Sequence, residues 1–141
     1  MYRIGVLAIA VLMTSCGASK MTQCNSIAKV TKDAEAAATK FAESSKTNPA
    51  NVAKSLTDMS TKSQEFSKVM QALEIKDEKL TGFQSRFVTM YQDYDKSFVQ
   101  MSSATEAKNA QAGDKALSEI QAISAKEDVL VKEFTAYCTG K

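Results

Sequence analysis

The 141-residue chain contains no histidine and no tryptophan, and it has only one proline and five glycines. The lack of histidine removes the commonest general base and a common metal ligand. Few prolines and glycines argue against a turn-rich all-β fold. A charge excess is also missing, because 18 basic residues stand against 16 acidic ones. No basic patch with arginines is visible, so we expect no nucleic-acid partner.

Helical proteins hold haem or metal through motifs that this sequence lacks. A c-type haem needs Cys-x-x-Cys-His, a b-type or c′-type haem normally has an axial histidine, and di-iron bundles need Glu-x-x-His. Met59, Met70, Met90 and Met101 recur at apolar positions. We interpret them as core packing rather than as a copper(I) site. The sequence therefore predicts no cofactor, no metal site, no catalytic residue and no enzymatic activity.

The N-terminus combines a short positive region with a short apolar run. Arg3 and the terminal amine precede the ten-residue segment 4–13. Such a run is too short to cross a bilayer as a helix, which takes about 20 residues. Its position is typical of a signal peptide for export, with cleavage nearby.

The run ends in Leu12-Met13-Thr14-Ser15-Cys16, which resembles the lipobox of bacterial lipoprotein signal peptides, although leucine is usual where Met13 stands. The resemblance implies that residues 1–15 are removed and that Cys16 becomes the acylated N-terminus, bound to a membrane of the cell envelope. Several acyl chains on one residue give stable anchoring. By the same analogy, Gly17 favours the outer membrane in a cell that has two. Ordinary secretion without acylation is the alternative.

Two cysteines, Cys24 and Cys138, remain beside Cys16. An exported chain enters an oxidising compartment, in which a disulfide between them is the default interpretation. Two unpaired buried thiols or one reactive nucleophile are the alternatives. The bridge would close a loop of more than 100 residues, and chain entropy assigns about 4.7 kcal/mol to such a loop.

The rest of the chain is predicted to be helical, with residues 16–21 as a short tether and 22–141 as one domain. Apolar residues recur at spacings of three and four on four segments. Their stripes are Ile27, Thr31, Ala34, Ala38 and Phe41; Val52, Leu56, Met59, Ser63, Phe66, Met70 and Leu73; Leu80, Phe83, Phe87, Met90, Tyr94, Ser97 and Met101; and Leu117, Ile120, Ser124, Glu127, Val131, Phe134 and Cys138. We predict an all-α, antiparallel up-and-down four-helix bundle. An even number of helices returns the C-terminus to the starting end, which is what a bridge between Cys24 and Cys138 requires.

The helix boundaries are predicted from capping residues. Asn48-Pro49 suits an N-cap and first helical position, and Asp77 suits the next N-cap. Gly113-Asp114 predicts the last turn, near 110–113. Ser103-Ala104-Thr105-Glu106 has the pattern of a capping box, which is the alternative place for the third helix to break.

Glu127 is the one acidic residue in an apolar stripe. It either reaches water at the edge of the core or belongs to a polar layer inside the bundle. Sliding antiparallel helices from the bridged end places these residues at its level: Ala34, Glu35, Ala38, Ser63, Tyr91, Tyr94 and Ser97. Glu127, Ser63 and Tyr94 are therefore the candidates for a polar layer or ligand site, in which a buried carboxyl would have a raised pKa.

Two functions are consistent with the predicted lipid-anchored bundle. The first is an exported, lipid-anchored, non-catalytic accessory module that docks on a protein partner at the membrane surface, and it predicts an exposed apolar patch of several hundred Å². In architecture only, the body resembles small helical lipoproteins found beside bacterial membrane complexes. The alternative is a small-molecule-binding bundle, and it predicts a cavity between helices with aromatic walls and a few convergent polar groups.

Overall fold

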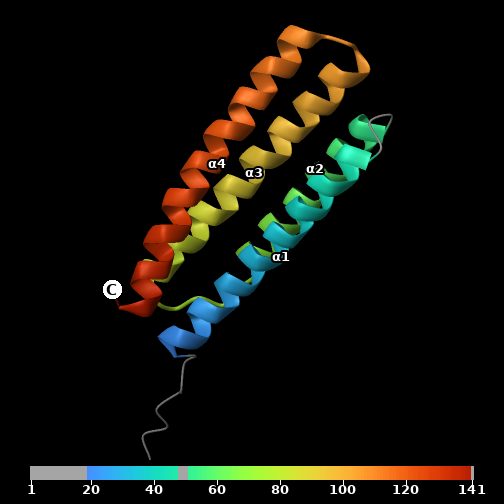
Figure 1. Cartoon of the computed structure of the whole chain (residues 1–141). Coiled ribbons are helices and arrows are strands. Elements are labelled where there is room, and N and C mark those ends of the chain that lie inside the picture. Colours follow the sequence, from blue (N-terminus) through green and yellow to red (C-terminus); the bar gives the residue numbers. More distant parts are fainter. Residues whose placement is uncertain (1–18, 48–50, 141) are drawn as a thin grey trace, which may run out of the picture.

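The computed structural model describes residues 19–47 and 51–140, which form four antiparallel helices in an up-and-down bundle (Figure 1). They are α1 (Lys20–Thr47), α2 (Val52–Gln71), α3 (Glu78–Glu106) and α4 (Ala110–Thr139). The predicted fold class is confirmed. Residues 1–18, with Cys16 and the lipobox-like segment, lie outside the described residues.

The four helices do not enclose one another equally. The closest packing joins α2 to α3, α4 packs mainly on α3, and α1 packs mainly on α2. Backbone contacts of α1 with α3 and with α4 are sparse. The bundle thus consists of two central helices and two outer ones, with its open edge between α1 and α4.

The apolar stripes of the central helices are confirmed. Every stripe residue predicted for α2 and α3 is buried or half-buried, and Phe87 and Met70 are fully enclosed. Each central helix has neighbours on two sides, so a wide face loses contact with water. Burying that face is the main stabilising contribution to such a helix.

The stripe predicted for α4 is rotated by about one residue from the buried one. The buried side chains of this helix are Ala116, Ile123, Leu130 and Phe134. Leu117 is 45% exposed and Val131 is 38% exposed, although both were expected to face the core. The reason is that α4 buries the face turned to α3, while the face turned towards α1 has no close neighbour.

The start of the first helix and the last turn differ from the prediction. Lys20 and Met21 are helical rather than part of the predicted tether, 16–21. The expected turn at 110–113 is wrong, because α3 ends at Glu106 and α4 begins at Ala110. Asn109 is the N-cap of α4, and its side chain accepts a hydrogen bond from the backbone N–H of Ala112 at 3.1 Å.

The turn between α3 and α4 comes before the predicted position, and two of the predicted helix ends change with it. Gly113 lies inside α4 rather than in a turn, and Ser103–Glu106 is the last turn of α3 rather than a new start. Asp77 is the N-cap of α3 as predicted, since its carboxylate accepts a bond from the N–H of Leu80 at 2.9 Å. Asn48-Pro49 lies outside the described residues, and Asn51 is the N-cap position of α2.

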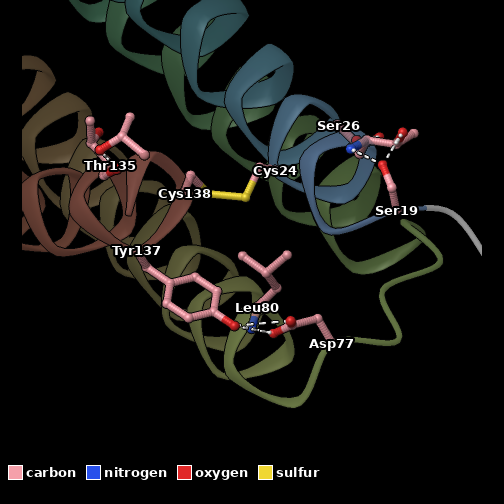
Figure 2. Close-up of a disulfide and its surroundings, with 10 residues drawn as sticks. Ser19, Cys24, Ser26, Asp77, Leu80, Thr135, Tyr137 and Cys138 are labelled. Atoms are coloured by element: carbon pink, nitrogen blue, oxygen red, sulfur yellow. Dashed lines mark hydrogen bonds between the residues drawn. A yellow bond between two sulfur atoms is a disulfide. The ribbon is translucent and has the colours of Figure 1, made fainter. Parts of the chain in front are cut away.

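One end of the bundle is held together by a disulfide and by polar contacts (Figure 2). Cys24 of α1 is bonded to Cys138 of α4, with their Cα atoms 6.0 Å apart. The hydroxyl of Tyr137 donates to both carboxylate oxygens of Asp77, at 3.0 and 2.9 Å. The side-chain oxygen of Gln23 accepts bonds from the backbone N–H groups of Lys76 and Asp77. These contacts connect the start of α1, the link between α2 and α3, and the end of α4.

Candidate functional site: a groove between α1 and α4

The hydrophobic core is divided into two clusters of buried side chains. The larger one lies at the disulfide end and includes Ile27, Phe87 and Phe134. The smaller one consists of Leu56, Met59 and Phe98, with partly buried neighbours. Tyr94 packs against both clusters. The two clusters therefore meet at Tyr94.

At this level a groove of about 770 Å³ enters the bundle, and residues of all four helices line it. Ala34 and Glu35 belong to its α1 side, and Ser124 and Glu127 belong to its α4 side. Ala34 and Ala38 of α1 line the groove, and their small side chains leave space for it. The volume falls in the range of about 300–1,000 Å³ that ligand pockets occupy.

Five aromatic side chains form the wall of the groove: Phe41, Phe66, Tyr91, Tyr94 and Phe98. The rings of Tyr94 and Phe98 are stacked, with centroids 5.8 Å apart, and Phe41 meets Phe98 edge-on at 6.1 Å. Phe66 contacts Tyr91 with centroids 5.8 Å apart. These ring contacts join aromatic side chains of α1, α2 and α3.

Glu127 projects from α4 into this aromatic surface. Its carboxylate accepts a hydrogen bond of 2.7 Å from the hydroxyl of Tyr94. Burial raises the pKa of Glu127, the Tyr94 hydrogen bond acts in the opposite direction, and the negative charges of Asp128 and Glu35 raise it further. Burial, together with Glu127 itself, also raises the pKa of Tyr94. The carboxyl group is thus held in a half-buried place that disfavours its charge.

Tyr91 is the second polar feature of the wall. Its side chain is only 3% exposed, and its hydroxyl oxygen has no hydrogen-bond partner within residues 19–47 and 51–140. Burial, followed by the charge of Glu127, raises its pKa. A buried hydroxyl without a partner is uncommon in folded proteins, because the lost hydration is not replaced.

The structure brings the three candidate residues of the sequence together: Glu127, Tyr94 and Ser63 all line the groove. The Ser63 hydroxyl donates to the carbonyl of Met59 at 2.9 Å, so its hydrogen is already used within α2. Ser97, which was expected at the same level, is buried and does not line the groove. Whether these residues bind a ligand stays a prediction.

Sequence reasoning missed two lining residues that matter. Phe98 lies next to the predicted stripe of α3, yet it stacks on Tyr94. Asp128 follows Glu127 directly and lines the groove as an exposed side chain. The spacing of four between Tyr94 and Phe98 was the available signal, since residues four apart are neighbours on one helix face.

A second hollow, of about 540 Å³, lies at the disulfide end. Its cationic side chains already have partners. The Lys20 ammonium is 3.8 Å from the ring centroid of Tyr137, and Arg86 donates to Glu133 at 2.6 Å. The charged residues of this hollow therefore serve contacts between neighbouring helices at the disulfide end.

In the described part of the chain, no group of three or more Cys, Asp or Glu side chains is placed to hold a metal ion. Nor do those residues include a helix with the length and apolar character needed to cross a membrane. In comparisons with known proteins, no family model, no curated protein and no solved structure matches this chain.

Proposed function

We propose that this chain is an exported, lipid-anchored, non-catalytic binding protein of the bacterial envelope that takes a small amphipathic molecule into the groove between α1 and α4. The observation that carries the proposal is the groove itself, with five aromatic side chains and one half-buried carboxyl group on its wall. An apolar site with a few placed polar groups is what small-molecule recognition requires. Of the two functions that the sequence suggests, the geometry favours the binding protein.

The proposed anchor fits the way the bundle begins. Cys16 precedes the first residue of α1, Lys20, by four positions, and such a segment spans at most about 14 Å. An acylated Cys16 would therefore keep the disulfide end of the bundle close to the membrane surface. From Lys20 to Ala34, α1 rises by about 21 Å, so a bundle that stands upright on the membrane would hold the groove away from the lipid and within reach of dissolved ligands.

A protein-docking role is the second candidate. Leu117 and Val131 are exposed on the same face of α4, and Val131 also lines the groove. A helix of a partner protein could cover this face with its own apolar side chains. The two candidates differ in what fills the groove, so one experiment on the groove addresses both.

The experiment uses the full chain in lipid nanodiscs, with methionine methyl groups labelled for NMR. Titration with the neutral amphiphile 4-phenylbutanol should give a saturable shift of the Met59 methyl, because Met59 lines the groove. Met21 is 56% exposed at the start of α1 and serves as the internal control. Empty nanodiscs correct for partition of the probe into lipid.

A matched pair of variants locates the binding. Ala38→Phe places a large side chain in the groove, whereas Ala36→Phe makes the same change on an exposed position of α1 that does not line it. The first should remove the Met59 response and the second should retain it. A response equal in both variants, or no saturable response in the wild-type protein, would contradict the proposed function.

A further inference from the structure

The charges that line the groove are mostly negative. Glu35, Glu127 and Asp128 contribute three carboxylates, and Lys32 contributes one ammonium. The two charges that act on Glu127 in addition to its burial are those of Asp128 and Glu35, and both are negative. The lining residues of α2 and α3 carry no formal charge. Among the described residues, no lysine or arginine forms an ion pair with the half-buried carboxylate of Glu127, and Lys32 is the one cation in the groove lining.

The aromatic wall supplies a second kind of attraction. Tyr94 donates to Glu127 and stacks on Phe98, so a ring face and a carboxylate lie next to each other. A cation within about 6 Å of a ring centroid is attracted to the face of the ring, and the attraction increases when water is excluded. One bound ammonium group could thus meet the carboxylate and an aromatic face together.

Tyr91 provides an independent observation. Tyr91 is a lining residue of the same groove, and its buried hydroxyl has no partner among the described residues. A phenol oxygen accepts hydrogen bonds through its lone pairs, and an ammonium N–H is a donor. A ligand whose ammonium reaches the Tyr91 oxygen would give it the partner that it lacks among the described residues.

We infer that the groove selects an amphipathic organic monocation, in which an ammonium group faces Glu127 and an apolar body lies against the aromatic wall. This inference rests on the proposed function and names its ligand class. An anionic amphiphile of the same shape would place like charges together at Glu127, with only the exposed Lys32 to offset them. A neutral one would leave the carboxylate without its counter-ion.

The test uses three probes that share one phenylbutyl body: 4-phenylbutylammonium, 4-phenylbutanol and 5-phenylpentanoate. Their dissociation constants are measured from the Met59 methyl shift of the full chain in nanodiscs at neutral pH. We expect the ammonium probe to bind about tenfold more tightly than the alcohol, which corresponds to about 1.4 kcal/mol. The carboxylate probe should bind least tightly of the three.

Two variants assign the preference to one residue. Glu127→Gln keeps an oxygen that can accept from Tyr94 and removes the charge, so the ammonium and alcohol probes should then bind within about threefold of each other. Glu119→Gln removes a carboxylate of the same helix that does not line the groove, and the preference should remain. In the wild-type protein the ammonium affinity should also fall as acid protonates Glu127, while the alcohol affinity should not.

The outcomes separate the inference from the function on which it rests. If the alcohol binds as tightly as the ammonium probe, or the carboxylate probe binds most tightly, the cation preference is wrong and groove binding stands. If none of the three probes shifts Met59, the proposed function fails as well. Retention of the tenfold preference in Glu127→Gln would overturn the role assigned to this residue.

Discussion

Cys24 and Cys138 are 114 residues apart in sequence, and their bond joins two helices that otherwise contact each other little. The bond lies at the end of α1 and α4 at which the larger core cluster packs. Further along the same two helices, Ala38 and Ile120 line the open groove. The disulfide thus fixes the distance between the two sides of the groove from one end.

Replacing both cysteines by serine should lower the free energy of unfolding by as much as about 4 kcal/mol, because the closed loop is long. The α1–α4 edge should separate first, since few other contacts hold it. Urea unfolding of the oxidised, reduced and double-variant proteins measures the effect. Free thiols at both positions in the exported protein, or an unchanged midpoint after reduction, would contradict this prediction.

Acylation of Cys16 is tested by metabolic labelling with palmitate. Cys16→Ser should lose the label, because the thiol is the attachment atom for the anchor. Cys24→Ser is the matched control and should retain it. Labelling of Cys16→Ser at the wild-type level would refute the proposed anchor and, with it, the placement of the disulfide end near the membrane.

Asp77 predicts how stability changes in acid. The N–H of Leu80, helped by the Tyr137 hydroxyl, lowers the pKa of Asp77 in the folded state. This contribution is therefore present above the unfolded pKa of about 3.9 and is lost as pH falls through the lower folded value. Thermal melts from pH 6 to pH 2 should show a smaller acid loss for Asp77→Asn, which still caps the helix, than for the wild-type protein.

A control separates this effect from general acid destabilisation. Asp114→Asn changes an exposed carboxylate of α4 and should follow the wild-type profile. An Asp77→Asn profile that falls in parallel with the wild type would show that the Asp77 cap does not titrate as described.

The central helices were predictable because each repeats its apolar residues over its whole length and is covered on both sides. The stripe of α4 was predicted less well, since Leu117 and Val131 fit the same spacing but face an open edge. Periodicity identifies an apolar face, but it does not say whether a neighbour covers that face. That information depends on how four helices pack together, which local pattern does not encode.

The level of the groove followed from register. Counting the same number of residues forward from Cys24 and back from Cys138 places Glu35 beside Glu127, and both line the groove. The bond between Tyr94 and Glu127 joins residues 33 apart, and its formation depends on side-chain direction as well as level. The last turn was predicted at Gly113-Asp114, which has a helix-end pattern, whereas the structure begins α4 after Asn109, a residue type that is a strong N-cap.

Tyr91→Phe should raise the stability of the unliganded protein by about 1 kcal/mol, because it removes a buried hydroxyl that has no partner among the described residues. Tyr94→Phe is the matched change, and it should lower stability by about 1 kcal/mol because Glu127 loses its donor. Urea unfolding of both variants gives the two values. Equal effects in the same direction would show that the two hydroxyls do not differ as described.

Glu127 should affect stability in the direction opposite to Asp77. Its pKa in the folded state is raised, first by burial, so its folded form binds a proton more readily than its unfolded form. Its contribution is therefore most favourable below the unfolded pKa of about 4.3 and declines as pH rises through the higher folded value. Glu127→Gln removes this decline, so its stability relative to the wild-type protein should increase from pH 4 to pH 8.

Glu127→Leu tests the hydrogen bond separately from the charge. It removes the same carboxylate, but it also leaves the Tyr94 hydroxyl without the acceptor that it now has at 2.7 Å. Glu127→Leu should therefore be about 1 kcal/mol less stable than Glu127→Gln at every pH from 4 to 8. Urea unfolding of the three proteins across this range is the measurement. If the leucine variant is as stable as the glutamine variant, or more stable, the Tyr94–Glu127 bond contributes nothing to the stability of the folded state. Glu127 is then a side chain at the edge of the core, where water satisfies its hydrogen bonds equally well.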